Sequence, residues 1–353
     1  MSGSPGRYTV IPSPALESLL DEALAGIGSA IGDLRLPGLK AVVLGGGYGR
    51  GEGGVLHTAQ GDRLYNDLDF FVFSSGADPA AARRIDGALK TLSEPWEKKL
   101  GIAVDFGPVK NLESLGGVAS TLMFQELLRG WKPVWGQIDL AQWIPALESD
   151  RLPFSEAVRL LLNRGMGLIF AGEYLRAGTD NPDFIVRNMM KVLLGSGDSL
   201  LIAAGAYRWR GTERTAAFAE YAKQENLPEE YVRLYERAFR YKLEPEPVLP
   251  SDPLAEWREC RKFYLDAVRF VAGVNSDATE KAVASGLSRR AAGERSFKNL
   301  LRWARRTGRV RFCSGMFDAP VVTVLGRLYG KMVLSDTYTI CPAELRKLWA
   351  VFN

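Results

Sequence analysis

The sequence predicts an α+β protein in two parts: a mixed sheet covered by helices in residues 1–150, and an all-helical domain in residues 151–353. In the first part, short apolar runs of strand length alternate with segments of helical periodicity. After about residue 150 the strand signals fade, and apolar residues recur at helical spacing. A chain of 353 residues with 46% hydrophobic residues is long enough for two packed domains of ordinary size.

The first part begins with an expected amphipathic helix over residues 15–32, in which Leu16, Leu20, Leu24 and Ile27 share one face. Apolar runs predict four strands, at Lys40–Leu44, Asp69–Phe73, Ile102–Val109 and Lys132–Trp135. Helical periodicity predicts two further helices, at residues 79–100 and 119–129.

The second part is expected to contain nine apolar helices. They cover residues 155–175, 183–194, 197–208, 212–224, 228–242, 254–273, 294–307, 320–334 and 342–352. Pro182, Gly195-Ser196-Gly197 and the proline-rich stretch Glu244–Pro253 are read as breaks. The last of these is expected to be a loop that divides the helices into two packed groups.

The composition limits the chemistry. Three scattered cysteines, Cys260, Cys313 and Cys341, fit a reducing cytoplasm rather than a disulfide framework. His57 is the only histidine, so a zinc site or a histidine general base is not expected, and His57 is interpreted as a plain loop residue. We expect neither a signal peptide nor a membrane span, because no apolar run approaches 18 residues.

The net charge of +4 conceals an asymmetry. Residues 1–150 hold 13 basic and 18 acidic residues, whereas residues 151–353 hold 32 basic and 23 acidic residues, giving net charges of −5 and +9. A basic half favours anionic substrates or the triphosphate of a nucleotide. The alternative is that ordinary solvated helix faces account for most of the excess.

A glycine-rich turn and three aspartates carry the strongest functional signal. The run AVVLGGGYGRGEGG begins at Ala41, NDLDFFVF follows at Asn66, and GIAVDFGPV places Asp105 in another strand. Side chains alternate along a strand, so Asp67 and Asp69 share a face while Leu68 points into the core. Carboxylates grouped in this way suit Mg²⁺ or Mn²⁺, and a glycine turn can bring backbone N–H groups close to phosphates.

Gly46-Gly47-Tyr48-Gly49-Arg50-Gly51-Glu52, followed by Asn66-Asp67-Leu68-Asp69, resembles the signature of the DNA polymerase β-like nucleotidyltransferase superfamily. The Arg-Gly-Glu portion is similar to the small-molecule and protein nucleotidyltransferases, and the resemblance covers roughly residues 38–140. Two features depart from the family pattern. Gly47 replaces the usual serine, and the longer spacing to Asp67 implies an inserted loop around His57–Tyr65.

The resemblance implies a nucleotidyltransferase-like first domain and metal-dependent transfer of a nucleoside monophosphate, AMP from ATP, to a hydroxyl group, with release of pyrophosphate. It implies that Asp67 and Asp69 bridge two metal ions, and that Asp105 completes the first and helps to deprotonate the acceptor. Gly46 and Gly47 would admit the triphosphate, with Arg50 near its phosphates. The acceptor stays open: a sugar phosphate, a protein side chain or an RNA end, with an anionic one favoured by the basic second half.

The second half offers further candidates. Arg187 and Lys191 lie four residues apart on one helix face. The surrounding piece resembles the helical substrate domains of such enzymes, where basic residues reach the nucleotide phosphates or the acceptor; a solvated basic face is the alternative. The tract 289–311 carries nine basic residues against Glu294. Basic faces with aromatic residues can bind nucleic acid, but the favoured interpretation is a solvated face with Phe297, Leu301 and Ala304 in the core.

Other interpretations of these motifs stay open. The glycines 49–54 also satisfy the GxGxxG pattern of dinucleotide-binding folds, although they stand five residues past the strand and the acids begin their strand rather than end it. The glycines could also form a plain turn. A separate alternative is that Arg50 and Glu52 make only a local ion pair. A nucleotide-binding regulatory module without turnover and an RNA-directed nucleotidyltransferase are the alternative functions.

Overall fold

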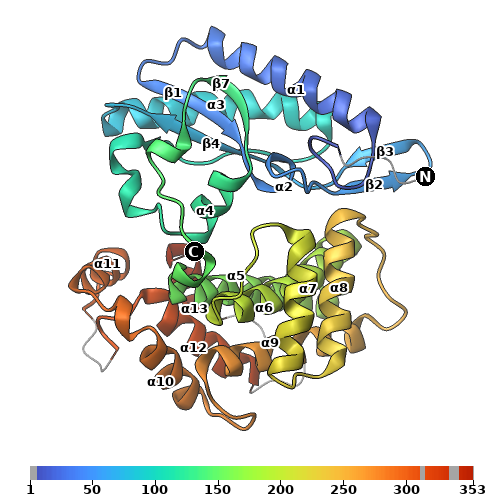
Figure 1. The fold of residues 1–353 in the computed structure, drawn as a ribbon, viewed down its shortest axis with the longest axis vertical. Helices are drawn as coiled ribbons and strands as arrows, with labels where there is room; N and C mark the ends of the chain where they lie inside the picture. The colour runs from blue at the N-terminus through green and yellow to red at the C-terminus, as the bar shows by residue number, and fades with distance from the viewer. Residues whose placement is uncertain (1–5, 311–314, 334–341, 353) are drawn as a thin grey trace. The chain divides into compact units, whose positions relative to one another are not determined.

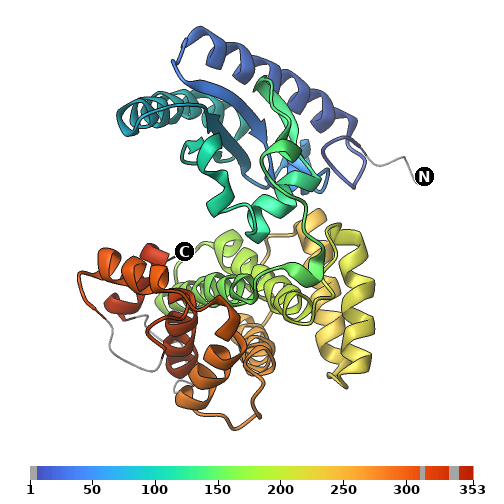
Figure 2. The same cartoon turned by 60° about the vertical axis from the view of Figure 1, so that its left-hand side comes forward.

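In the computed structural model, residues 6–310, 315–333 and 342–352 are described, and the chain forms two compact units (Figures 1 and 2). The first unit comprises Met1–Leu147 together with Arg240–Glu246, and the second comprises Glu148–Phe239 and Pro247–Asn353. The main stretch of the first unit ends at Leu147, close to the expected boundary at residue 150. A short segment from the middle of the helical half belongs to the first unit.

The first unit contains a five-stranded mixed sheet. Its strands are β1 (Leu39–Leu44), β4 (Leu68–Ser74), β5 (Val104–Phe106), β6 (Lys110–Asn111) and β7 (Lys132–Gly136). The order is β5-β4-β1-β7, and β6 also pairs with β4. β1 runs antiparallel to β4 and β7, whereas β4 runs parallel to β5 and β6. β1 leads into the glycine turn, and β4 carries Asp69. These two strands are therefore neighbours in the sheet.

Both faces of this sheet are covered (Figure 1). The helices α1 (Pro14–Asp33) and α3 (Pro79–Leu100) pack on one face, where Val42, Phe70 and Val72 are buried among their apolar side chains. The 3₁₀ helix η1 (Leu112–Gly117) and the helix α4 (Leu122–Arg129) pack on the other, against Val43 and Phe73. Alternation of side chains along each strand places these two sets on opposite faces.

The second unit is built of helices (Figure 2). They are α5 (Phe154–Ala177), α6 (Pro182–Ala203), α7 (Gly211–Gln224), α8 (Glu229–Leu243), α9 (Pro253–Ala272), α10 (Glu280–Arg290), α11 (Phe297–Thr307), α12 (Pro320–Val333) and α13 (Ala343–Phe352). α5 and α6 lie along each other, and α9 packs against both of them. The expected loop at Glu244–Pro253 is confirmed, since no helix or strand covers residues 244–252.

The coarse fold expectation is confirmed: a small mixed sheet with many helices in the first unit, and helices in the second. Four local predictions are wrong. The strand expected at 102–109 is two short strands, because Pro108 cannot donate to a ladder. The expected loop around His57–Tyr65 contains a hairpin of β2 (Val55–Thr58) and β3 (Gly61–Leu64), and α10 was not predicted. Finally, α6 runs unbroken through Gly195-Ser196-Gly197.

Candidate functional site

The glycine turn that follows β1 packs directly on Asp69. Gly45 N donates a 2.8 Å hydrogen bond to the Asp69 carbonyl oxygen, and the one-turn helix α2 (Gly46–Gly49) begins at the next residue. Gly46 has a φ of +61°, and a Cβ placed there would lie closer than 3.0 Å to the Asp69 carboxylate. Only glycine fits this position without strain. The turn therefore holds its backbone against a predicted metal ligand.

Gly47, the second predicted phosphate-binding glycine, is not constrained in this way. Its φ lies outside the left-handed region, and the nearest atom to an added Cβ would be the Glu52 carbonyl oxygen at 3.4 Å. A serine at this position, as in the family pattern, would meet ordinary contacts. The strict requirement for glycine falls on Gly46 rather than on Gly47.

Two side chains that sequence analysis did not single out hold the end of the turn. Asn66 Oδ1 accepts a 2.6 Å hydrogen bond from Gly54 N. The buried hydroxyl group of Tyr48 donates to Gly54 O at 2.8 Å and accepts from Tyr65 N at 3.0 Å. The position of Asn66 directly before Asp67 was the available signal, and together these bonds tie the glycine run to the start of β4.

Strand register brings two of the predicted aspartates side by side. In the parallel pair β4–β5, Asp69 is opposite Asp105, while the adjacent pair Leu68 and Val104 is buried in the core. Asp69 and Asp105 therefore project from the face opposite to that core, on neighbouring strands about 4.8 Å apart. Asp67 precedes β4 by one residue and is partly buried.

The charge of Asp67 affects two neighbouring groups, Asp105 and Tyr48. The pKa of Asp105 is raised first by partial loss of water around its carboxyl group, although the residue as a whole is exposed, and then by the negative charges of Asp67 and Glu97. Burial raises the pKa of Tyr48 to about 12, with a smaller contribution from Asp67. Asp67 is therefore close enough to affect both groups. The surroundings of Asp105 and Tyr48 therefore disfavour their ionised, negatively charged forms.

No ready-made metal centre is present within the described residues, since no three histidine, cysteine, aspartate or glutamate side chains are grouped so that they could hold an ion. The donor chemistry nevertheless fits a hard divalent cation. Asp67, Asp69 and Asp105 supply carboxylate oxygens only. The pKa of Asp105 is raised first by desolvation and then by the negative charges of Asp67 and Glu97, and a bound cation would offset those charges.

Arg50 and Glu52 are not simply paired with each other. Arg50 Nη1 lies 3.2 Å from Glu126 Oε2, and its Nε lies 3.9 Å from Glu52 Oε2. The closest cation to Glu52, which is only 6% exposed, is the Lys242 ammonium group at 2.7 Å. Lys242 was missed because it stands 190 residues away in the chain, where no local pattern indicates it.

Lys242 belongs to the segment Arg240–Glu246, which is part of the first unit and contacts the β2–β3 hairpin through Glu244 and His57. In the same segment, the hydroxyl groups of Tyr241 and Tyr65 are 2.6 Å apart. His57 is a β2 residue rather than a loop residue. Its Nδ1 lies 2.7 Å from Asp62 and its Nε2 lies 3.5 Å from Glu244. The hydrogen bond to Asp62, followed by the contact with Glu244, raises the pKa of His57 above its usual 6.5.

The predicted basic residues Arg187 and Lys191 belong to the second unit. Both lie on α6, where Arg187 pairs with Asp183 at 2.9 Å and Lys191 is exposed. Arg187 and Lys191 therefore lie on the same helix, four residues apart, as expected. Their contact with a nucleotide stays a prediction.

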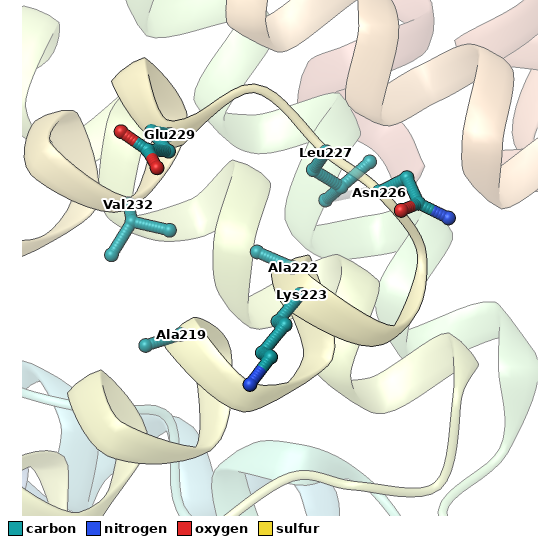
Figure 3. Close-up of a pocket in the computed structure, with 7 residues that line it drawn as sticks. All are labelled: Ala219, Ala222, Lys223, Asn226, Leu227, Glu229 and Val232. Atoms are coloured by element: carbon teal, nitrogen blue, oxygen red, sulfur yellow. The ribbon is translucent and has the colours of Figure 1, made fainter.

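A pocket in the second unit lies where α7 turns into α8 (Figure 3), with a volume of about 470 Å³. Its lining residues are Ala219, Ala222, Lys223, Asn226, Leu227, Glu229 and Val232. None of the predicted site residues is among them, and one lysine with one glutamate does not form a catalytic constellation. The candidate site therefore stays at the glycine turn.

Comparison with known proteins gives no assignment: no family model matches the sequence, and neither a curated protein nor a solved structure matches it. Among the described residues, no helix is at once long and apolar enough to pass through a membrane.

Proposed function

We propose that the chain is a metal-dependent nucleotidyltransferase that transfers a nucleoside monophosphate, AMP from ATP, to a hydroxyl group and releases pyrophosphate. The observation that carries the proposal is the pairing of Asp69 with Asp105 on neighbouring parallel strands, with Gly46 packed against the Asp69 carboxylate. This joins a glycine turn to paired carboxylates, as the resemblance to polymerase β-like nucleotidyltransferases requires.

Each part of the site has a chemical task in this proposal. Asp67, Asp69 and Asp105 would hold Mg²⁺ or Mn²⁺. When bound, the ions supply Lewis-acid stabilisation of charge on the transferred phosphoryl group. By the resemblance, Asp105 would also accept the proton of the acceptor hydroxyl.

The turn is suited to receive the phosphates. Gly46 and Gly47 open α2, and the first N–H groups of a helix have no acceptor within the helix. Gly46 has no side chain to keep a ligand away from the backbone beside Asp69. Arg50 adds positive charge at the end of α2, partly neutralised by Glu126 and Glu52.

The test is release of pyrophosphate from ATP with Mg²⁺ or Mn²⁺ in the presence of a panel of hydroxyl acceptors. Asp67→Asn and Asp69→Asn should each lower the rate by about 10²–10⁴, since each removes a ligand whose charge stabilisation is worth several kcal/mol. Asp33→Asn, at an exposed aspartate near the end of α1, is the matched control and should retain full activity. Wild-type rates in both ligand variants would refute the assignment.

Mn²⁺ and ATP binding, measured by calorimetry, separate the enzyme from its closest alternative. An enzyme should bind ATP in a metal-dependent manner and turn it over. Binding that is lost in Asp69→Asn, without turnover for any acceptor, would instead indicate a nucleotide-binding regulatory module.

A further inference from the structure

The helix α11 belongs to the second unit (Figure 1), and its buried residues are Asn299 and Trp303. Asn299 Nδ2 donates to the carbonyl oxygens of Glu294 at 3.1 Å and Phe317 at 3.0 Å. Trp303 is 7% exposed and stacks on Phe352, with ring centroids 5.2 Å apart. The inner face of α11 is therefore occupied by Asn299 and Trp303.

This register overturns the expectation that Phe297 and Leu301 lie in the core. Phe297 is 63% exposed and Leu301 is 40% exposed. Four residues apart, they form an apolar stripe on the outer side of α11. The sequence prediction failed because Phe297 and Leu301 match the helical period as well as Asn299 and Trp303 do.

Cations border this stripe. Lys298, Arg302 and Arg306 follow one another at intervals of four residues, in a row beside the row of Phe297, Leu301 and Arg305. Four residues of helix rise about 6 Å, so the cations stand at regular intervals along a helix of about 16 Å.

These cations differ from the neighbouring arginines of the same tract. Arg290 donates to the carbonyl oxygens of Val271 and Ala203, and Arg295 pairs at 2.8 Å with the buried Asp318. In the described part of the chain, no ion-pair partner is found for the exposed cations Lys298, Arg302, Arg305, Arg306 and Arg309. Their charge is thus available to a partner.

We propose that this outer face of α11, defined by Phe297, Lys298, Leu301, Arg302, Arg305 and Arg306, binds single-stranded RNA. The row of cations is complementary to a phosphate backbone, and the exposed ring of Phe297 offers a surface on which an unpaired base can stack. Arginines predominate over lysines, as suits phosphate recognition through two parallel hydrogen bonds.

Two apolar side chains on so short a helix bury too little surface to hold a protein in a membrane interface, where even one acyl chain binds weakly. The proposed RNA-binding face is separate from the proposed nucleotidyl-transfer site, because α11 contains none of the residues assigned to that site.

The test measures binding of the full-length protein to a fluorescent 20-nucleotide oligouridylate between 50 and 300 mM salt. Affinity should fall with salt, with a log–log slope of about −0.7 for each phosphate neutralised. Arg302→Gln with Arg306→Gln should flatten the slope by about 1.4. Phe297→Ala should weaken binding about tenfold without changing the slope, because it removes stacking rather than charge.

Arg83→Gln with Arg84→Gln, on α3 of the first unit, is the charge-matched control and should behave as wild type. The proposal fails if the α11 variants leave binding unchanged or if the control weakens it equally. It also fails if Phe297→Ala has no effect and duplex RNA binds as tightly as the single strand. Binding to vesicles of 30% phosphatidylserine, or to a polyglutamate peptide, without binding to the oligonucleotide would likewise overturn it.

Discussion

Asp69 and Asp105 are separated by an entire helix in the sequence, yet the register of two parallel strands sets them opposite each other. Their proximity is a property of the sheet. The pKa of Asp105 is raised first by desolvation and then by the negative charges of Asp67 and Glu97. Such an arrangement disfavours ionisation in the folded state unless a cation is bound. The stability of the chain should therefore report on the site even without a substrate.

Replacing Asp105 tests this directly. Its pKa is raised in the folded state, so the folded chain binds the proton more tightly than the unfolded chain does. Stability should then fall as pH rises from the unfolded value of 3.8 through the raised folded value, and the full penalty should persist at neutral pH. Asp105→Asn should raise the melting temperature at pH 7 in a metal-free buffer and remove this part of the pH dependence.

Thermal unfolding followed by circular dichroism at a series of pH values measures the effect, with Asp33→Asn as the control. A lower melting temperature for Asp105→Asn would mean that the carboxylate makes a compensating contact in the folded chain. Added Mg²⁺ should stabilise the wild type and not the variant, because a ligand that binds only the folded state shifts unfolding in proportion to its occupancy.

Some residues of the candidate site could be predicted from the sequence, and others could not. Asp67, Asp69, Asp105 and Gly46 were predicted because alternation along a strand and the glycine motif are local patterns. Lys242 could not be predicted in this way, since its contact with Glu52 depends on how a distant helix end packs.

The segment Arg240–Glu246 carries the main polar contact to the end of the glycine turn, through Glu52 and Lys242. Lys242→Met should remove the cation that lies 2.7 Å from the buried Glu52 carboxylate. Removal of one partner from a buried pair costs roughly 3 kcal/mol or more, because the remaining charge is uncompensated. The urea midpoint of unfolding should fall accordingly.

Glu52→Gln combined with Lys242→Met provides the control, because it removes both charges. This double variant should recover much of the lost stability, so that the two changes are strongly non-additive. Equal losses in the single and double variants would show that packing of the lysine stem, rather than its charge, holds the segment.

The helix α6 shows why the glycine break was wrongly predicted. A Cβ on Gly197 would come closer than 3.0 Å to the ring of the buried Tyr235, and one on Gly195 would meet the Arg164 side chain equally closely. Glycine is present here for close packing between helices rather than for a turn. Sequence alone cannot distinguish these two uses of glycine, whereas the long periodic helices were predicted to within a few residues.

Two glycine substitutions of opposite sign follow. Gly197→Ala should destabilise the chain by about 1–2 kcal/mol, because overpacking outweighs the gain in helix propensity. Gly87→Ala, in the middle of α3 with no atom within 4 Å of an added Cβ, should instead stabilise it by about 0.5–1 kcal/mol. Urea unfolding measures both, and stabilisation by Gly197→Ala would place Tyr235 elsewhere.

Across the whole molecule, charge is divided unevenly: −5 in residues 1–150 and +9 in residues 151–353. This difference between the two halves of the sequence bears on the acceptor of the proposed reaction. In the proposed reaction the carboxylates of the first half would hold a cation, whereas a basic helical half attracts anions. Polycationic acceptors such as aminoglycosides are therefore disfavoured relative to sugar phosphates or other anionic hydroxyl compounds.

This charge difference predicts how turnover depends on salt. For an anionic acceptor, kcat/KM should fall several-fold between 0.05 and 0.3 M ionic strength. The reason is that the Debye screening length falls from about 14 Å to about 6 Å, which weakens the attraction between the basic half and the acceptor. The kcat should change little, since contacts within the site are short and partly desolvated. A neutral sugar serves as the control and should show no salt dependence, so that effects on ATP or metal binding are separated from steering of the acceptor. Faster turnover of a polycation than of a sugar phosphate at low salt would show that the basic half does not select the acceptor, and would leave its excess charge as a property of solvated helix faces.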